Sequence, residues 1–273
     1  MSEAPSFRAR YGPCALIAGA AVGLGAEWAR QVAAHRLDVV LLDRDGDALR
    51  RTADDIRERH GVQVRAVTLD LARADLVEAI RAATAGLEIG LLVCNAACGV
   101  VAPFLELEAA HLQAMLDVNC RAPLLLAHAL AAPMVQRGRG GIVLMSSLSG
   151  NIGSAQLAVY AASKAFDLVL ADALWVELRS HGVDVLAVQP GSTRTPGWLV
   201  SQPADADQAL PVMEPADVVR EALDTLGVEP GIVPGELNRQ GADALTRLPR
   251  RQAIELMSAI TGALVPNNRP RIR

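Results

Sequence analysis

The chain has 273 residues, of which 51% are hydrophobic and 21% are charged, and its formal net charge is −4. A chain of this length can bury about three quarters of its unfolded surface, and the composition excludes a disordered protein. Interspersed acids and bases give no indication of a nucleic-acid partner. Since aromatic residues make up only 3%, we expect a core of small and aliphatic side chains, as in helices packed on a buried parallel sheet.

Segments typical of strands and of helices alternate along the chain. In chain order they are a strand at residues 14–18, a helix at 25–35, a strand at 38–42, a helix at 47–60, strands at 62–69 and 87–93, a helix at 108–136, a strand at 141–145, a helix at 157–180, a strand at 183–188, a helix at 215–226, a strand at 231–233 and a helix at 242–261. Pro123 and Pro133 are expected to kink or end the long helical stretch that contains them. The alternation predicts an α/β fold, a doubly wound and mostly parallel seven-stranded sheet with helices on both faces, in three αβα layers.

No internal repeat or linker divides the chain, so residues 1–273 are expected to form one domain. Residues 197–210 have loop-like composition, and the basic end at 267–273 is expected to be a flexible tail. The longest uncharged stretch, residues 140–163, is rich in Ser and Gly, so we predict no membrane span. The apolar segment after Arg8 and Arg10 resembles a signal peptide, but three glycines interrupt it and cleavage would remove a strand.

Cysteine usage indicates a cytoplasmic protein without a bound metal. No Cys-x2-Cys or Cys/His pair has the spacing of a zinc site, and we expect the thiols to be reduced and to behave as small apolar side chains. The four cysteines are Cys14, Cys94, Cys98 and Cys120.

A glycine cluster follows the first strand and opens the first helix, in the order Gly19-x3-Gly23-Leu24-Gly25. Glycine at these positions allows a tight turn and a close approach of the backbone to a pyrophosphate. The free N–H groups and partial positive charge of the helix N-terminus would face that anion. The position between a strand and a helix therefore predicts a dinucleotide site.

The choice of dinucleotide depends on the end of the second strand. The carboxylate of Asp43 would accept hydrogen bonds from the adenosine ribose hydroxyls and repel a 2′-phosphate, which favours NAD. The guanidinium of Arg44 could instead grip the 2′-phosphate of NADP, or it is a solvated surface group. We predict NAD, with NADP as the alternative. Asp70 and Leu71, at the end of the third strand, would lie near the adenine, and Asp70 could equally cap the turn that follows.

The residue pair that indicates the chemistry is Tyr160 and Lys164, which follow Ser147 by thirteen and seventeen residues. Residues four apart share one face of a helix, so the phenol and the ammonium point the same way. An adjacent ammonium favours the phenolate, and a tyrosine so tuned can exchange a proton with an alcohol or a ketone. Such pairs are also common on exposed helices. The pair indicates catalysis here because the glycine cluster, Asp43 and Asn119 lie at positions compatible with a dinucleotide site.

Together the motifs resemble those of a short-chain dehydrogenase/reductase of the compact, single-domain branch, over roughly residues 13 to 196. They are Ala18-Gly19-Ala20-Ala21-Val22-Gly23-Leu24-Gly25, Cys94-Asn95-Ala96-Ala97, Asn119, Ser147, Tyr160-x3-Lys164 and Pro190-Gly191-Ser192-Thr193-Arg194-Thr195. Ala18, Cys94, Ala97 and Thr193 depart from the usual family pattern, but none of them removes a proton donor. The resemblance implies a Rossmann fold.

The resemblance also implies a role for each matching residue. Tyr160 would be the general acid/base, Lys164 would favour its phenolate and bind the nicotinamide ribose, and Ser147 would hold the substrate oxygen. Asn119 would kink its helix and hold a water that links Lys164 to solvent, and Asn95 would shape the floor of the cofactor cleft. Further cofactor contacts would come from Pro190, Gly191, Thr193 and Thr195, with Thr195 at the nicotinamide carboxamide.

We therefore predict an oxidoreductase that interconverts a secondary alcohol and a ketone. The family resemblance places a substrate lid at residues 197–230, and its apolar side chains favour an apolar substrate, although Trp198 could be an ordinary core anchor. The apolar lid residues are Trp198, Leu199, Val200, Leu210, Val212 and Met213, and its acids include Asp205 and Asp207. The alternatives are an NADPH-dependent 3-oxoacyl thioester reductase and, from another class, a catalytically silent nucleotide-binding protein. Relatives of this kind pair through the two long helices, so a homodimer or homotetramer is expected.

Overall fold

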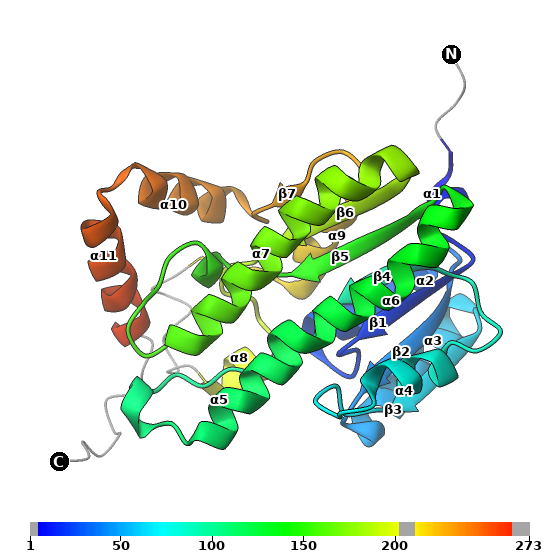
Figure 1. Ribbon diagram of the computed structural model, residues 1–273, viewed down its shortest axis with the longest axis horizontal. Helices are drawn as coiled ribbons and strands as arrows, with labels where there is room; N and C mark the ends of the chain where they lie inside the picture. Colours follow the sequence, from blue (N-terminus) through cyan, green and yellow to red (C-terminus); the bar gives the residue numbers. More distant parts are fainter. Residues whose placement is uncertain (1–4, 202–210, 264–273) are drawn as a thin grey trace.

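The computed structural model describes residues 5–201 and 211–263, which build a seven-stranded sheet with helices on both sides (Figure 1). The strands are β1 (Cys14–Ala18), β2 (Asp38–Asp43), β3 (Val64–Thr68), β4 (Ile89–Cys94), β5 (Gly140–Met145), β6 (Val183–Val188) and β7 (Gly231–Ile232). Their order across the sheet is β3-β2-β1-β4-β5-β6-β7, and every neighbouring pair is parallel. The doubly wound sheet predicted from the alternation is confirmed.

The helices fall into two layers because successive strand residues point to opposite faces of the sheet. Along β1, Ala15 and Ile17 join one buried cluster, whereas Leu16 and Ala18 join the other. The helices are α1 (Phe7–Tyr11), α2 (Gly23–Ala34), α3 (Gly46–His60), α4 (Leu76–Ala83), α5 (Ala109–Leu116), α6 (Ala122–Arg137), α7 (Ala158–Leu178), α8 (Pro196–Ser201), α9 (Pro215–Thr225), α10 (Glu236–Arg247) and α11 (Arg250–Ala263). Side chains of α2, α3 and α9 fill the first cluster, and side chains of α4, α6 and α7 fill the second.

The long apolar stretch predicted as one helix is interrupted. A π-helical turn, Asp117–Arg121, separates α5 from α6, Pro123 lies in the first turn of α6, and Pro133 lies inside it. By length and hydropathy alone, the continuous helical stretch Ala109–Arg137 could cross a membrane. Since α6 instead packs its Ala122, Leu126 and Met134 side chains into the core, its apolar character is that of a core helix.

Two predictions for the C-terminal third are wrong in part. The helix predicted at residues 242–261 is two helices, α10 and α11, with Pro249 between them, because a proline lacks the N–H that would continue a helix. The loop predicted at residues 197–210 begins as the helix α8, whose Trp198 N–H is capped by Thr195 Oγ1 at 3.2 Å. The rest of that loop, with Asp205, Asp207 and Leu210, and the predicted tail at 267–273 lie outside the described residues.

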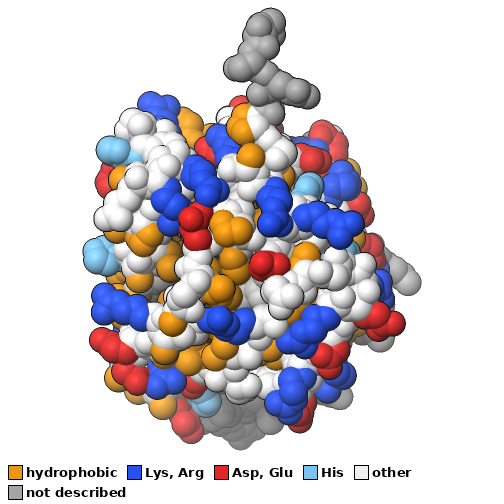
Figure 2. All heavy atoms as spheres, turned by 90° about the vertical axis from the view of Figure 1, so that its right-hand side faces the viewer, with side chains coloured by type: hydrophobic (Ala, Val, Ile, Leu, Met, Phe, Trp, Pro, Cys, Tyr) orange, Lys and Arg blue, Asp and Glu red, His pale blue; other side chains and the backbone are white. Residues whose placement is uncertain are grey.

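The two ends of the sheet differ in what they expose. The carboxyl ends of the strands lie on the left of Figure 1, beside α8 and the start of α7. The opposite end, near α1, is the face shown in Figure 2, where acidic and basic side chains are interspersed around hydrophobic ones. Pairs such as Arg10 with Asp184 and Arg139 with Glu88 contribute to that mixture. The charges on this face are mixed. In open parallel sheets, ligands bind beyond the carboxyl ends of the strands, so we place the site at the opposite end.

Candidate active site

The glycine turn between β1 and α2 is packed so closely that side chains are excluded from it. Gly19 has φ +85°, and a Cβ there would lie 2.6 Å from Ala96 Cα. A Cβ on Gly25 would lie 1.8 Å from the Gly19 carbonyl oxygen, so α2 could not pack behind the turn with a larger residue. The Asn95 side-chain amide donates to the same carbonyl at 2.8 Å. The turn is thereby held rigid with the N-terminus of α2 behind it, as an anion site requires.

A cleft of about 320 Å³ opens beside this turn, across the ends of β1 to β4. The turn, both acidic strand ends and Thr195 meet there, although they are far apart in the sequence. The predicted cofactor residues that line it are Gly19, Gly23, Leu24, Asp43, Arg44, Asp70, Leu71, Asn95 and Thr195. Ala96, Ala97, Cys98 and Val118 also line it, and these were not predicted as cofactor-binding residues.

The acidic groups in the cleft already bind backbone N–H groups. Asp43 accepts hydrogen bonds from the N–H groups of Ala21 at 3.0 Å and Asp45 at 3.1 Å, which ties the glycine turn to the end of β2. Asp70 accepts from the Ala72 N–H at 2.9 Å. Asp70 therefore caps the following turn and lines the cleft at the same time, so the two readings of this residue are compatible.

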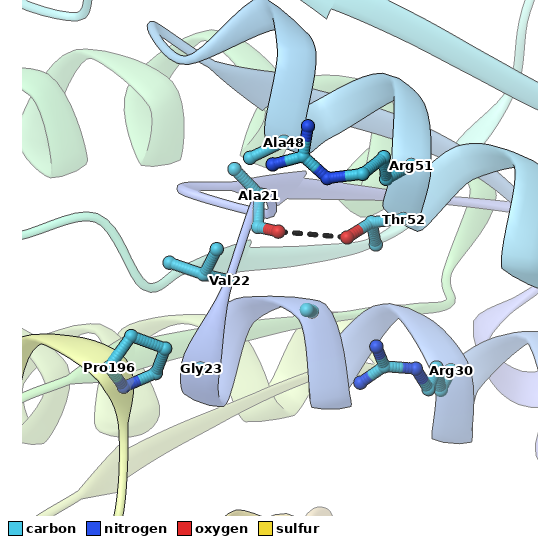
Figure 3. Close-up of a pocket in the computed structure, with 9 residues that line it drawn as sticks. Ala21, Val22, Gly23, Arg30, Ala48, Arg51, Thr52 and Pro196 are labelled. Carbon is cyan, nitrogen blue, oxygen red and sulfur yellow. Dashed lines mark hydrogen bonds between the residues drawn. The ribbon is translucent and has the colours of Figure 1, made fainter.

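A second hollow of about 330 Å³ lies behind the glycine turn, between α2 and α3 (Figure 3). The Thr52 hydroxyl donates to the Ala21 carbonyl at 2.8 Å and supports the turn from this side. In Figure 3, the Arg51 side chain runs along α3 toward Ala48 and Ala21. Within residues 5–201 and 211–263, its guanidinium has no recorded hydrogen bond or ion pair, whereas the nearby Arg30 binds Asp55 at 2.9 Å.

The residues expected to exchange the proton lie at the start of α7. Tyr160 is half-buried, and Lys164 is 2% exposed. The Lys164 Nζ donates to the Met145 carbonyl at 2.7 Å and to Asp167 Oδ2 at 3.0 Å, and it lies 6.0 Å from the centre of the Tyr160 ring. The phenol and the ammonium thus share one side of the helix, as the four-residue spacing predicts.

The two serines at the end of β5 do different things. The Ser146 hydroxyl is buried and donates to the Lys164 carbonyl at 2.7 Å, so it fastens β5 to α7. Ser147 caps the short 3-10 helix Leu148–Gly150, where its Oγ accepts from the Ser149 N–H at 3.2 Å. Ser147 is therefore the serine whose hydroxyl is not used to join the two elements.

Asn119 is fully buried in the π-helical turn and joins three segments. Its Oδ1 accepts from the Cys98 N–H at 2.8 Å, and its Nδ2 donates to the Cys98 carbonyl at 2.8 Å and to Ser163 Oγ at 3.0 Å. The segment so fixed continues into Gly99, where a Cβ would lie 2.7 Å from Cδ2 of Tyr160. Asn119 thus positions the wall against which the Tyr160 ring packs.

The predicted residues after β6 shape the site but only Thr195 lines the cleft. The Pro190 carbonyl accepts from the Leu148 N–H at 3.1 Å, which joins this loop to the segment after Ser147. A Cβ on Gly191 would meet Asn238 Oδ1 at 2.6 Å, and Thr193 forms a bridge with Met213. Gly25, Tyr160 and Lys164, also predicted to contact the cofactor, do not line the cleft either.

A family model described as short chain dehydrogenase matches residues 13–204. The chain belongs to the short-chain dehydrogenases. This dehydrogenase is 32% identical over 235 residues to 7beta-hydroxysteroid dehydrogenase of Clostridium sardiniense, with 86% of this chain and 90% of the relative covered. It is 30% identical over 222 residues to very-long-chain 3-oxoacyl-CoA reductase of Homo sapiens, with 80% and 70% covered.

Solved structures similar to this dehydrogenase point the same way. One, from a study of 7beta-hydroxysteroid dehydrogenase stereoselectivity, superposes with a TM-score of 0.87 at 28% identity and covers 93% of this chain and 99% of its own. Another, a short-chain dehydrogenase of Sphingobium yanoikuyae in complex with NADPH, has a TM-score of 0.74 at 31% identity and covers 95% and 98%. The protein is therefore an NAD(P)-dependent oxidoreductase that interconverts an alcohol and a ketone.

The site of this dehydrogenase fits a nicotinamide dinucleotide on its own evidence. Gly19, Gly23 and Leu24 line the cleft, so the N-terminus of α2 lies beside it, and a Cβ on Gly19 would meet Ala96, which lines it too. Among the described residues, no group of three or more His, Cys, Asp or Glu side chains could hold a metal ion.

Sequence reasoning missed two residues that touch the proposed proton-transfer groups, Asp167 and Gly99. Asp167 follows Lys164 by three residues on a helix that was predicted, so its contact with the ammonium could have been found from the spacing. The contact of Gly99 with the Tyr160 ring had no comparable signal, because it depends on how β4, α5 and α7 pack.

Proposed function

We propose that this short-chain dehydrogenase acts on a ring hydroxyl or ketone of a bulky apolar substrate of the hydroxysteroid class. The observation that carries the proposal is the extent of the similarity to the 7beta-hydroxysteroid dehydrogenase structure, 93% of this chain. A match of that extent reaches beyond residues 13–204, which the family model matches. The similarity is therefore not confined to the cofactor-binding part of the chain, which supports the proposal.

Three segments that are hydrogen-bonded to one another would form the substrate site near Tyr160. The Ala102 N–H donates to the Gln156 carbonyl at 3.0 Å, which joins the segment after Gly99 to the segment before Tyr160. From the other side, α11 is tied to that segment by Thr261 Oγ1 and Ser154 Oγ, 2.8 Å apart.

Apolar side chains are exposed in this region. Val100 is 39% exposed and Leu199, in α8, is 56% exposed. In Figure 1, α8 and α11 lie on the same side of the molecule as the start of α7. An apolar substrate would cover such surface, and its removal from water would favour binding.

In the proposed mechanism the cofactor, when bound, supplies or accepts the hydride, and the protein handles the proton. Tyr160 exchanges a proton with the substrate oxygen, and the Ser147 hydroxyl donates to the same oxygen where negative charge develops. Lys164 brings the positive charge that favours the phenolate of Tyr160. Asn119 keeps the Cys98 segment against α7. The glycine turn of Gly19 would hold the pyrophosphate.

We propose NAD as the preferred cofactor, on the strength of Asp43. Its carboxylate lines the cleft beside the glycine turn, where it would accept from the ribose hydroxyls and repel a 2′-phosphate. The counter-argument is that Arg44 lines the same cleft and Arg51 extends toward Ala21 behind the turn. Titrating the protein with NADH and NADPH by fluorescence decides between them, and tighter binding of NADPH refutes the preference.

We also propose a cytoplasmic homodimer or homotetramer with one catalytic domain per chain. All four cysteines are free thiols, as expected in a reducing compartment. On α7, Val169 and Val176 are 65% and 57% exposed and lie seven residues apart on one face, and Leu124 of α6 is 42% exposed. Light scattering of the purified protein tests the assembly, and a monomer at micromolar concentration refutes it.

The test of the substrate class is an absorbance assay at about 340 nm, where reduced nicotinamide absorbs, with three kinds of substrate. Hydroxysteroids and oxosteroids are compared with long-chain 3-oxoacyl thioesters and with small secondary alcohols. We expect turnover of the steroids, since their rings cover the apolar side chains around Tyr160. Turnover of the thioesters alone would replace this proposal with the reductase alternative.

The control for the mechanism is Tyr160→Phe, which removes the phenol oxygen and keeps the ring against Gly99. We expect turnover to be abolished while NADH still binds, because the Tyr160 oxygen is needed for the proton and not for the fold. Turnover within tenfold of the parent would show that Tyr160 is not the acid/base.

A further inference from the structure

Lys164 is the only lysine in the chain, and the other 25 residues of the Lys and Arg total are arginines. Its side chain is 3% exposed, and so is buried almost completely. A buried ammonium is unfavourable unless a counter-charge lies beside it, since burial favours the neutral amine. Because a neutral Lys164 could not favour the phenolate, the proposed mechanism depends on what keeps this one amine protonated.

We propose that Asp167 is a positioning residue that holds Lys164 as an ammonium in the orientation that the reaction of Tyr160 requires. The Asp167 carboxylate is 4% exposed, and its Oδ2 lies 3.0 Å from the Lys164 Nζ. Its role rests on the proposed function of Tyr160 and Lys164, although the contact itself does not. Neither a metal nor a cofactor is needed for the interaction.

Among residues 5–201 and 211–263, no other counter-charge contacts the Lys164 ammonium. The second acceptor of the Lys164 Nζ, the Met145 carbonyl, is neutral. The titratable groups that face the pair from other elements are the thiols of Cys94 in β4, Cys98 in the segment after β4, and Cys120 in the π-helical turn. Burial raises the pKa of all three thiols, so they stay protonated and uncharged near neutral pH. In the described part of the chain, Asp167 is therefore the one carboxylate that contacts this ammonium.

The three groups lie in a fixed order along α7. Tyr160, Lys164 and Asp167 are separated by four and three residues, so the phenol, the ammonium and the carboxylate follow one another along one face. Along the helix, Lys164 lies between the other two residues, and its Nζ is 3.0 Å from Asp167 Oδ2 and 6.0 Å from the centre of the Tyr160 ring. A third N–H of the Lys164 ammonium remains beyond the two bonds to Met145 and Asp167.

Burial of the Asp167 carboxylate is unfavourable for the fold. Burial raises the pKa of Asp167 to about 6, and the attraction of Lys164 only partly offsets this rise. The Asp167 Oδ1 is also buried without a hydrogen-bond partner among residues 5–201 and 211–263. A buried carboxylate with one oxygen unsatisfied is unfavourable for folding. We therefore attribute the position of the Asp167 carboxylate beside Lys164 to a role in keeping Lys164 charged.

The presence of a single lysine permits a direct test without substrate or cofactor. Protein labelled with ¹³C- and ¹⁵N-lysine gives one side-chain resonance set, whose shift with pH reports protonation of the Lys164 Nζ. In Asp167→Asn we expect the titration midpoint of this amine to fall by at least one pH unit, a tenfold or greater loss of proton affinity. Asp167→Glu keeps the carboxylate and should recover at least half of that fall.

Asp224→Asn, the same chemical change at an exposed site on α9, is the matched control and should leave the midpoint unchanged. An unchanged midpoint in Asp167→Asn overturns the proposal. If Asp167→Asn does not fold, the pH dependence of the Lys164 resonance in the parent protein tests the proposal instead. Its Lys164 resonance should shift with a midpoint near pH 6, where Asp167 takes up its proton, and a flat response between pH 5 and 7 overturns the proposal.

Kinetics separate positioning from a merely structural effect. With saturating cofactor and substrate, Asp167→Asn should lose turnover progressively as pH rises past the new midpoint and recover it at lower pH. A structural defect would instead lower kcat by one factor at every pH. Because the resonance is measured without turnover, failure of the proposed function would leave the lysine titration intact, and the two failures are distinguishable.

Discussion

The burial of Asp167 has a consequence for stability that can be measured as a function of pH. The ordinary pKa of its carboxyl group is 3.8, and burial raises it to about 6 in the folded protein. The folded protein therefore binds the proton more tightly than the unfolded chain does. In the parent, the contribution of Asp167 to stability is present below pH about 4 and is lost as pH rises through about 6.

The magnitude follows from the two pKa values. At about 1.4 kcal/mol per pH unit, the rise makes ionisation of Asp167 about 3 kcal/mol less favourable in the folded protein than in the unfolded chain. Roughly 2 kcal/mol of this falls between pH 4 and pH 7, because the unfolded carboxyl group is already partly ionised at pH 4. Asp167→Asn cannot ionise, so it lacks this dependence.

The assay is urea unfolding of the parent and Asp167→Asn at several pH values from 4 to 8. The free energy of unfolding of the variant minus that of the parent should become more positive by about 2 kcal/mol between pH 4 and pH 7 and change little above that. Taking the difference cancels the titrating groups that do not contact Asp167, and the change at Lys164 is measured separately from its resonance. A difference that falls with rising pH would show that the attraction of Lys164 outweighs burial and holds the pKa of Asp167 below its ordinary value, which would refute the reasoning.

Three further substitutions test the site. Asp43→Ala should weaken NADH binding more than NADPH binding, and an unchanged ratio of the two dissociation constants would remove Asp43 from cofactor choice. Gly99→Ala should lower kcat tenfold or more, because the added Cβ would lie 2.7 Å from Cδ2 of the Tyr160 ring. Gly241→Ala is the control, because a Cβ there would meet no atom within 4 Å, and it should leave kcat unchanged. Equal effects of the two substitutions would contradict the packing argument. Asn119→Ala should destabilise the protein by about 3 kcal/mol in urea unfolding, because three buried hydrogen bonds are lost, and a loss below about 1 kcal/mol would mean that water replaces the amide.

Local patterns were sufficient for much of the fold. The strand predicted at residues 183–188 has those bounds in the structure, as does the one at 14–18. The strand at 14–18 is an apolar run between Pro13 and Gly19, and the strand at 183–188, apolar except for Asp184, lies between Gly182 and Gln189-Pro190. Neighbours in the chain were therefore enough to set their ends. The single helix expected at 242–261 fails at Pro249, which is also a local signal, because a proline lacks the N–H that would continue a helix.

The sequence by itself determined which groups are available: a glycine turn after a strand, acids at strand ends, and a tyrosine with the only lysine four residues on. Only the tertiary structure decided what surrounds them. Packing of β4 and α5 against α7 brings Asn119 to the Cys98 backbone and Gly99 to the Tyr160 ring. Burial, which no local pattern measures, turns Asp167 from one more helical carboxylate into the counter-charge of Lys164, because the energy of a charge depends on how much water the whole fold removes from it.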